Sequence, residues 1–412
     1  MIATLLFAVF IITMMLGVPI GASLGLAGAA AIALANAEAP WFGLLAVPQN
    51  FYAGLGKYPL LAIPMFVLVG SIFDRSGVAL RLVNFAIALV GRGPGMLPLV
   101  AICVAMFLGG ISGSGPANAA AVGAVMIAAM NRAGYPASYS ASVVGAAAAT
   151  DILIPPSVAF IVYSVLVPGA SVPALFAAGM IPGVLAGIAL IVPAVWMARK
   201  HGMGHLESSL PRPPLLKSFI DAIWGLAAPV LILGGMRMGW FTPTEAAVVA
   251  VFYGLFVGLF VHRSMTLRDL FPILKESGEL SAVILLVVSL AGIFAFSLST
   301  LGVIDPITRA IVNSGLGEYG VLALLILMLI TIGMFLDGVS IFLIFVPLLW
   351  PIVQHYNWDP VWFGVLLTLK VALGQFTPPL AVNLMVSCRI ANVRMEETVR
   401  WVGWMLFAMF LV

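Results

Sequence analysis

The chain consists of apolar segments separated by short clusters of glycine, proline and charged residues. Most of the segments are long enough to span, or to half-span, the hydrocarbon core of a bilayer as a helix. The pattern therefore predicts an all-α polytopic membrane protein, because helices satisfy their own backbone hydrogen bonds in lipid. Helices are expected over residues 2–35 (interrupted near Gly17), 60–73, 78–90, 96–110, 117–130, 138–152, 157–167, 173–198, 220–236, 244–261, 280–301, 321–335, 340–353, 362–375, 380–390 and from 399 onward.

Two segments, residues 39–57 and 267–279, mix apolar and polar positions, which favours helices that lie along the membrane surface. Residues 200–217 form the longest polar stretch and predict a boundary between two halves. We therefore expect four parts: residues 1–58 (scaffold helices and a surface arm), 59–199 (a first repeat), 200–279 (a cytoplasmic loop, scaffold helices and a second surface arm) and 280–412 (a second repeat).

Composition agrees with a membrane protein. Of the 412 residues 63% are hydrophobic and 8% are charged, and the mean hydropathy is +1.19. A soluble domain carries about 25% charged residues, so a soluble fold is excluded. The net charge is only +3, with basic residues mostly in short loops, which is unlike a nucleic-acid-binding protein. Cys103 and Cys388 lie in apolar segments, and we expect buried, inert thiols.

The interruptions of the apolar segments occur in pairs. Gly115 lies 40 residues before the first proline of the pair Pro155-Pro156, and Gly338 lies 40 residues before the first proline of the pair Pro378-Pro379. Without a gap, residues 114–160 therefore align with residues 337–383. Interruptions at corresponding positions of two halves are typical of transporter binding sites. We expect two repeats, each with a helical hairpin and a broken helix.

Loop charges indicate that the two repeats are inverted. Arg92 and Arg132 flank the first hairpin, Glu318 and Asp359 flank the second, and residues 310–369 contain no lysine or arginine. Because basic loops remain in the cytoplasm, the first hairpin should enter the membrane from the cytoplasm and the second from outside. Both would be re-entrant.

The first candidate site is the break within residues 109–118, where four glycines and a proline interrupt an apolar segment. Broken backbone at membrane depth is tolerated only where it is buried in protein or lines a cavity. Ser112, Ser114 and Asn118 add neutral oxygen atoms to the freed carbonyls, a set that suits Na⁺. The alternative is a packing seam of small residues between helices.

The second candidate site surrounds Pro155 and Pro156, which should end one helix and let another begin. The new helix would direct free N–H groups and its positive dipole end toward the gap, where a carboxylate could bind together with Ser112 and Ser157. Thr150 and the backbone up to Pro155 would complete the cation site. A plain proline kink is the alternative. Asp151 is an acid within a membrane segment and is therefore a candidate functional residue; alternatively it forms an ion pair or lies at the mouth of a cavity.

The second repeat offers equivalents. Asp337 could ligate a cation or carry a proton, and Lys370 could pair with an acid, contact an anionic substrate or extend to the membrane surface. The hairpin tips and the breaks contain no arginine, so a guanidinium clamp is not expected there. The candidate cation ligands are Asp337, Gly338, Ser340, Gly374 and Thr377, and the candidate substrate contacts are Thr377, Pro379 and Asn383.

In their order and spacing, these motifs resemble the large membrane subunit of tripartite ATP-independent periplasmic (TRAP) transporters over essentially the whole chain. The motifs are Leu16-Gly17-Val18-Pro19-Ile20, Ala62-Ile63-Pro64-Met65-Phe66, Gly113-Ser114, Ile154-Pro155-Pro156-Ser157 and Thr377-Pro378-Pro379. Two places depart from the pattern. Asn118 stands where an acid is common, and Thr150-Asp151-Ile152-Leu153 stands where the family more usually has small residues together with Gly-Pro. Both departures lie at the candidate site, so the substrate class stays open.

The resemblance implies secondary active import of carboxylates, such as C4-dicarboxylates or sialic acids, across the bacterial inner membrane. The coupling ion would be Na⁺, which is not a prosthetic group. The expected partners are a small four-helix membrane subunit, a periplasmic substrate-binding protein and membrane lipid. The implied fold is similar to that of elevator-type divalent-anion symporters, in which a transport domain slides against a scaffold.

Two other functions are consistent with parts of the sequence. A standalone divalent-anion/Na⁺ symporter of similar fold would share the breaks but need no partner subunit. An intramembrane serine protease is indicated only by the short motif Gly110-Ile111-Ser112-Gly113. Its serine would need a base within hydrogen-bonding distance. The four histidines, His201, His205, His262 and His355, all fall in loops or at segment ends.

Overall fold

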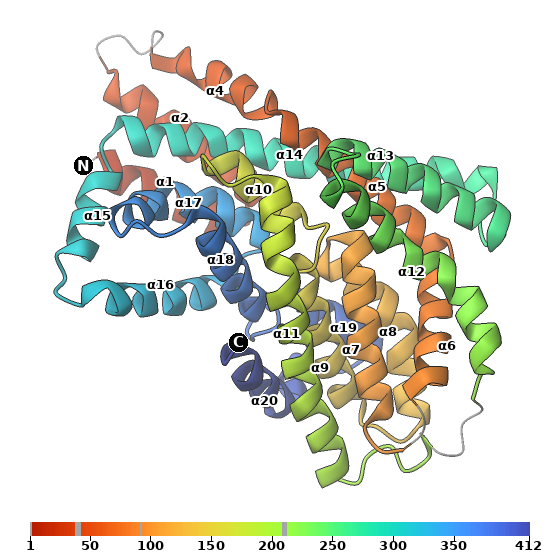
Figure 1. Cartoon of the computed structure of the whole chain (residues 1–412). Helices are drawn as coiled ribbons and strands as arrows, with labels where there is room; N and C mark the ends of the chain where they lie inside the picture. The colour runs from red at the N-terminus through yellow and green to blue at the C-terminus, as the bar shows by residue number, and fades with distance from the viewer. Residues whose placement is uncertain (1, 38–42, 91–92, 208–211) are drawn as a thin grey trace.

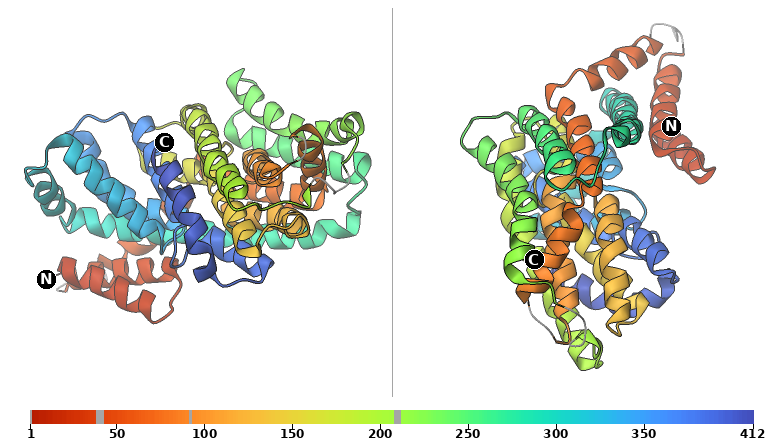
Figure 2. Two further views of the ribbon diagram at one scale, coloured as in Figure 1. Left: turned by 90° about the horizontal axis from the view of Figure 1, so that it is seen from below. Right: turned by 90° about the vertical axis from the view of Figure 1, so that its right-hand side faces the viewer.

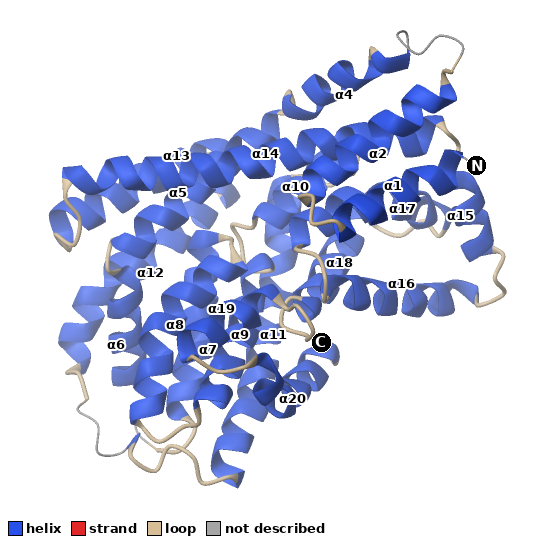
Figure 3. Cartoon of the chain, turned by 180° about the vertical axis from the view of Figure 1, so that it is seen from behind, coloured by secondary structure: helices blue, strands red, loops and turns tan. Residues whose placement is uncertain are grey.

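The computed structural model describes residues 2–37, 43–90, 93–207 and 212–412, and every regular element within them is a helix (Figure 3). The predicted interruption is present at Gly17, where φ is +85° and Pro19 then caps the next helix. Of the surface helix expected over residues 39–57, residues 39–42 lie outside the described chain. The first elements are α1 (Ile2–Met15), α2 (Ile20–Ala35), α4 (Ala46–Leu55) and α5 (Ala62–Arg75), which a 3-10 turn over Tyr58–Leu61 precedes.

The predicted repeats each contain a hairpin and a broken helix. The first, over residues 59–199, contains α5 and then α6 (Val78–Val90), α7 (Met96–Ser112), α8 (Gly115–Arg132), α9 (Ala137–Ala148) with a 3-10 turn over Ala149–Ile152, α10 (Val158–Leu166) and α11 (Val172–Lys200). The second half comprises α12 (Leu215–Arg237), α13 (Pro243–Phe256) with a π turn over Val257–Val261, α14 (Leu270–Thr300), α15 (Ile304–Val312), α16 (Gly317–Gly333), α17 (Gly338–His355), α18 (Pro360–Gly374), α19 (Val382–Ala391) and α20 (Val399–Phe410). Among the α-helices of the described residues, only α15, a helix of 9 residues, was not expected.

The helix bounds follow the internal register that the proline pairs predict. In that register α8 and α17 coincide from their first residue to their last, and α9 and α18 begin at aligned positions. The break then separates α9 from α10 in one repeat and α18 from α19 in the other. Few side chains are identical in the two repeats, so the shared architecture depends on where the helices are interrupted.

The two repeats interlock. The helix after the first break, α10, packs against α17 of the second hairpin, and the helix after the second break, α19, packs against α8 and α9. In Figure 1, α16 reaches the middle of the molecule from the left and α7 from below, so the hairpin tips come together there. The N-terminal helices α1 and α2 lie at the edge of the molecule, where α2 packs on α14 (Figure 2).

The surface and the helix lengths fit a bilayer. Six described helices are long and apolar enough to cross a membrane, over residues 58–75, 172–200, 215–237, 243–261, 267–300 and 338–355. Ile181, Val230 and Phe252 are each at least 68% exposed, as lipid-facing side chains would be. The predicted all-α membrane fold is therefore confirmed in class.

The expected surface helix over residues 267–279 is not a separate element. A 3-10 turn over Leu267–Asp269 leads directly into α14, which continues for 31 residues. Pro272 lies in its first turn, and an isolated glycine such as Gly278 does not end a helix. At 1.5 Å per residue α14 is about 46 Å long, which exceeds the roughly 30 Å hydrocarbon core. Its amphipathic first turns can therefore still lie at the membrane surface.

The polar loop after α11 is fastened to the base of the first hairpin. Glu207 is 5% exposed, and its carboxylate accepts hydrogen bonds from the Leu97 N–H at 3.0 Å and from the Tyr135 hydroxyl at 2.6 Å. Burial raises the pKa of Glu207. Further along the loop, Arg212 donates to the carbonyl of Ala88 in α6. The described ends of the loop are thus fixed to two different elements.

The orientation predicted from loop charge can be tested at Asn357, an exposed residue between α17 and α18. A cysteine at Asn357, in a background without Cys103 and Cys388, should react with an impermeant maleimide added to cells whose outer membrane is permeabilised. A cysteine at the exposed Lys217, in the first turn of α12 directly after the basic loop, should react only after the inner membrane is opened. The opposite pattern would show that the second hairpin faces the cytoplasm.

Candidate functional site

The tips of both hairpins line one cavity of about 270 Å³. Five pairs of aligned residues contribute to its wall, which places it between the two repeats. The opposite wall is apolar and comes from Val67 of α5 and from Leu280, Val283, Ile284 and Val287 of α14. The aligned pairs are Ser114 with Asp337, Gly115 with Gly338, Pro116 with Val339, Ile152 with Gln375 and Ala159 with Val382.

The first tip lies directly on the first break. Gly113 has φ +62°, and a Cβ atom there would lie 2.8 Å from the carbonyl oxygen of Pro156. Ser114 is the N-cap of α8, but its hydroxyl makes no capping hydrogen bond. It therefore remains available to a ligand in the cavity. The side chain of Ser112 lies outside the part of the chain that the structure describes, so its predicted roles stay predictions.

The second tip presents a carboxylate. Asp337 is the N-cap of α17 and accepts hydrogen bonds from the backbone N–H and the hydroxyl of Ser340. Both residues line the cavity, together with Gly338. The carboxylate is partly exposed there, next to the positive end of the α17 dipole. Asp337 and Ser340 together supply the strongest oxygen ligands of the cavity wall.

The helices after the breaks begin later than the sequence predicts. They start at Val158 and Val382 rather than at residues 157 and 380, because the residues after the proline pairs are needed to turn the chain. Ser157 is fully buried and is the N-cap of α10; its hydroxyl donates to the Ile152 carbonyl at 2.6 Å and accepts from the Phe160 N–H at 3.4 Å. The Ser157 hydroxyl is thus occupied within the fold.

Two buried amides leave oxygen atoms without hydrogen bonds. Among the described residues, Oδ1 of Asn118 and Oδ1 of Asn383 have no partner, although the side chains are 1% and 0% exposed. Nδ2 of Asn118 donates to the Ala105 carbonyl at 2.8 Å. An unpaired buried acceptor is costly, and a small hard cation would satisfy it. These oxygens therefore fit the predicted Na⁺ chemistry.

Several predicted residues lie away from the cavity. Hydroxyls of Thr150 and Thr377 donate to the carbonyls of Ala147 and Leu373 in the preceding helical turn, at 2.8 and 2.6 Å. Gly374 faces Gly333 of α16, where its Cβ would lie 2.4 Å from backbone atoms. Pro155, Pro156 and Pro379 shape the breaks but do not line the cavity either.

Asp151 and Lys370, the two charged residues whose roles the sequence leaves open, lie in different parts of the structure. Asp151 is fully buried against the first hairpin, where a Cβ on Gly109 would lie 2.7 Å from its Oδ1. Lys370 is 5% exposed and points to α20, with its ammonium 5.4 Å from the centre of the Phe410 ring. Lys370 is therefore remote from the cavity.

The side chain of Gln375 and the apolar wall from α14 were not predicted as parts of the site. Gln375 could have been recognised as a polar residue at the end of an apolar segment, three residues before a proline pair. The apolar residues of the α14 wall could not have been recognised in the same way, because any membrane-spanning helix carries such side chains. No cluster of three or more His, Cys, Asp and Glu side chains occurs in the described ranges, so a cation here would be held mainly by neutral oxygens.

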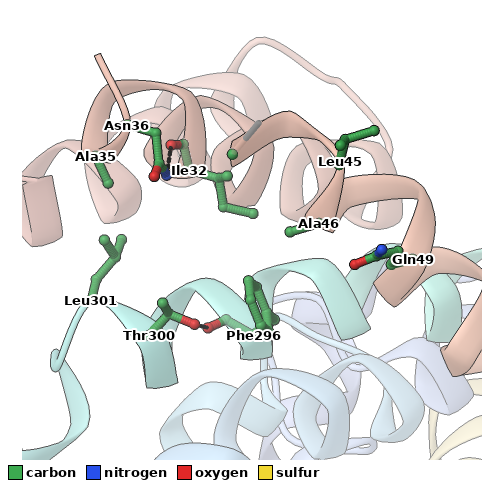
Figure 4. A pocket seen from close by; sticks show the side chains of 10 residues that line it. Ile32, Ala35, Asn36, Leu45, Ala46, Gln49, Phe296, Thr300 and Leu301 are labelled. Carbon is green, nitrogen blue, oxygen red and sulfur yellow. Dashed lines mark hydrogen bonds between the residues drawn. The ribbon is translucent and has the colours of Figure 1, made fainter. Parts of the chain in front are cut away.

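A second cavity of about 270 Å³ lies between α2, α4 and α14 (Figure 4). Its polar groups include the amides of Asn36 and Gln49, and Asn36 donates to the Ile32 carbonyl at 2.9 Å. The hydroxyl of Thr300 donates to the Phe296 carbonyl at 2.8 Å. No residue of either hairpin tip lines this cavity, so we assign the candidate site to the first one.

Comparison with known proteins shows to which family the chain belongs. Residues 7–412 match the family model described as "Tripartite ATP-independent periplasmic transporter, DctM component". The chain is 34% identical over 418 residues to the C4-dicarboxylate TRAP transporter large permease protein DctM of Rhodobacter capsulatus, covering 98% of this chain and 94% of that protein.

A second relative is longer than this chain. The chain is 36% identical over 396 residues to the isethionate TRAP transporter permease protein DctMQ of Oleidesulfovibrio alaskensis, covering 95% of this chain and 61% of that protein. Among solved structures, the Alcanivorax borkumensis YdaH transporter is similar with a TM-score of 0.58, 12% identity, and coverage of 90% of this chain and 86% of that one. This likeness supports the fold alone.

The close approach of the first tip to the first break predicts a specific sensitivity. Gly113 and Gly169 both have left-handed φ, +62° and +88°, but a Cβ at Gly169 would meet nothing within 4 Å. Gly169→Ala should lose about 1–2 kcal/mol from its backbone conformation. Gly113→Ala should lose about 1–3 kcal/mol more from overlap with Pro156. Apparent melting temperatures in detergent should therefore fall further for Gly113→Ala; equal shifts would contradict the described tip.

Proposed function

Because this chain belongs to the DctM component family of tripartite ATP-independent periplasmic transporters, we propose that it imports a small organic anion across the bacterial inner membrane, driven by a Na⁺ gradient. The chain is a multi-pass membrane permease of such a system and not an enzyme. The observation that supports the site is a cavity that both hairpin tips and both breaks line together.

The substrate that fits this cavity is a small carboxylate or a related oxyanion. Relatives are named for C4-dicarboxylate and for isethionate, and the cavity has room for a molecule of that size. Helices α8 and α17 begin at the cavity, so their first N–H groups and dipole ends favour an anion. The arginines of α8 and α19, Arg132 and Arg389, are exposed at the ends remote from the tips.

The affinity of such a site should be modest. Contacts with a helix dipole are worth roughly 0.3–1 kcal/mol each, up to ~2 when partly buried. Modest affinity suits a site that must release its cargo, and it leaves high-affinity capture to a soluble partner. The proposed partners are therefore a periplasmic substrate-binding protein and a small four-helix membrane subunit, in keeping with a tripartite system.

The coupling cation would bind beside the anion. Asp337, Ser340 and Ser114 line the cavity, and the amide oxygens of Asn118 and Asn383 are buried without partners among described residues. This donor set of one carboxylate and several neutral oxygens suits Na⁺. A bound Na⁺ would also offset the charge of Asp337, which otherwise repels an anionic substrate.

The movement we propose is of the elevator type. The interlocked hairpins and broken helices would form the moving body, and α14 with α2, α4 and α5 the scaffold, because α14 packs on all three. The cavity lies between these two groups, so a substrate in it would be carried along the scaffold surface. Inverted, re-entrant orientation of the hairpins belongs to the same proposal.

The alternatives differ in what they require. A standalone symporter of similar fold would transport without partners, and membership in the tripartite family favours the multi-subunit system. The serine protease is set aside, since the chain belongs to a transporter family.

Reconstitution tests the coupling and the partners together. Proteoliposomes with this chain, the small subunit encoded with it and the cognate binding protein should accumulate radiolabelled anion when Na⁺ is outside. Omitting the binding protein at low substrate concentration should nearly abolish uptake. Unchanged uptake in a K⁺-only buffer would contradict Na⁺ coupling, and robust uptake by this chain alone would favour the standalone symporter.

Asp337 offers a matched test of the cation site. Asp337 and Asp359 are both helix N-caps, bonded to the N–H groups of Ser340 and Trp362, but only Asp337 lines the cavity. Because asparagine caps a helix nearly as well as aspartate, Asp→Asn removes the charge and keeps the cap. Asp337→Asn should raise the Na⁺ concentration for half-maximal uptake about tenfold or more, whereas Asp359→Asn should leave it unchanged. Equal behaviour of the two variants would remove Asp337 from the cation site.

A further inference from the structure

Gln375 and Asn383 form a pair of buried side-chain amides across the second break. They are 5% and 0% exposed. Nδ2 of Asn383 donates to Oε1 of Gln375 at 3.2 Å, and the backbone N–H of Asn383 donates to the Gln375 carbonyl at 3.1 Å. These two hydrogen bonds close the segment between α18 and α19.

The amide pair connects the two hairpin tips. A Cβ atom on Gly115 would lie 2.7 Å from both Nδ2 and Oδ1 of Asn383. A Cβ on Gly338 would lie 3.1 Å from Nε2 of Gln375. The first tip therefore approaches one end of the pair and the second tip approaches the other, at distances that glycine permits most easily.

The first repeat builds the same break without amides. The residues aligned with Gln375 and Asn383 are Ile152 and Phe160, which are 5% and 0% exposed. The architecture thus does not require polar side chains at these positions. Burying an amide is unfavourable unless its hydrogen bonds are satisfied, so the pair needs another explanation.

Only one member of the pair reaches the cavity. Gln375 lines it, as does its aligned residue Ile152, whereas Asn383 does not. In the described chain, Nε2 of Gln375 makes no hydrogen bond, and its Oε1 is already engaged by Asn383. An amide nitrogen donates, and the oxygens of carboxylates and sulfonates accept. The donation from Asn383 therefore determines that Gln375 offers a donor, rather than an acceptor, to the cavity.

We propose that Gln375 sets the specificity of the transport site by donating a side-chain N–H to an oxyanion oxygen of the substrate, and that Asn383 is a positioning residue that orients this amide. The inference rests on the proposed function and adds the donor that recognises the anion. The recognised chemistry is shared by carboxylates and sulfonates. Gly115 and Gly338 keep the two tips close to the pair, so the donor is presented only where both tips meet.

The decisive variant is Gln375→Glu, which has the same shape. The new carboxylate can still accept the hydrogen bond from Asn383, but it presents an oxygen to the cavity instead of an N–H. The test uses the reconstituted system with its binding protein, and uptake of radiolabelled succinate and isethionate. The KM of the transported anion should rise roughly 10- to 100-fold, because a hydrogen bond to a charged group is lost. The Na⁺ concentration for half-maximal uptake should stay unchanged in Gln375→Ile, which adds no charge to the cavity.

A matched control carries the same change of charge. Gln354 is exposed on α17 near its far end, so Gln354→Glu should leave the KM unchanged. Gln375→Ile, which installs the residue of the first repeat, keeps an apolar packing and should raise the KM similarly. This second variant decides the question if Gln375→Glu does not insert. A wild-type KM in the inserted variants overturns the inference, and absence of uptake by the wild-type system overturns the proposed function itself.

The role of Asn383 is tested through a double-mutant cycle. Asn383→Asp can only accept, so Gln375 must turn its N–H toward residue 383 and its carbonyl toward the cavity. The KM should rise about as much as in Gln375→Glu, with little change in maximal rate. At saturating Na⁺, so that the proposed cation contact of Asn383 does not limit uptake, Asn383→Asp should have no further effect on the KM of the anion in a Gln375→Ile background, because its effect on that KM passes through Gln375. An added effect in that background would show that Asn383 acts by itself.

Discussion

The structure depends on one constraint: backbone N–H and C=O groups freed by a helix break cannot face lipid. The chain interrupts two helices at proline pairs and two hairpins at their tips, and both repeats contribute the protein that covers the breaks. Helix α10 packs on α17 and α19 packs on α8 and α9, whereas Gly113 lets the first tip approach the Pro156 carbonyl of its own repeat. Interlocking of the two repeats thus completes the burial that each hairpin tip begins.

The two repeats share an architecture but divide the chemistry unequally. At aligned positions of the cavity the first repeat has Ser114 and Ile152, where the second has Asp337 and Gln375. Carboxylate and amide thus come mostly from the second half, and the free hydroxyl comes from the first. A site between two repeats need not be symmetric, since each pair of aligned positions can hold one polar and one apolar residue. Such asymmetry suits a substrate that carries an anion at one end and lies next to a cation.

Much of the fold could be predicted from the sequence, because glycine and proline residues mark the positions at which the helices are interrupted. The spacing of Gly115 and Gly338 from their proline pairs gave the register that the helices follow. Side-chain roles were less predictable, since they depend on contacts between distant segments. Ser157 and Thr377 look like ligands in sequence, yet their hydroxyls bond to the backbone of their own segments. The continuity of α14 was missed for another reason: an amphipathic start and an apolar end are compatible with one helix as well as with two.

Successive stretches of α14 have different neighbours, which bears on the proposed movement. In the later stretch, Gly25 and Gly28 of α2 allow so close an approach that a Cβ on them would lie 2.6 Å from Leu290 and 3.0 Å from Ile293. Small residues of this kind hold helices together in membranes by close packing, which suits a static scaffold. In the earlier stretch, residues 280, 283, 284 and 287 present one apolar helical face to the cavity, and Val287 also meets Gly21 of α2. A body that slides along such a face breaks no hydrogen bond and exchanges one set of dispersion contacts for another. The polar groups lie instead on the hairpin tips and the break, where they would travel with the substrate.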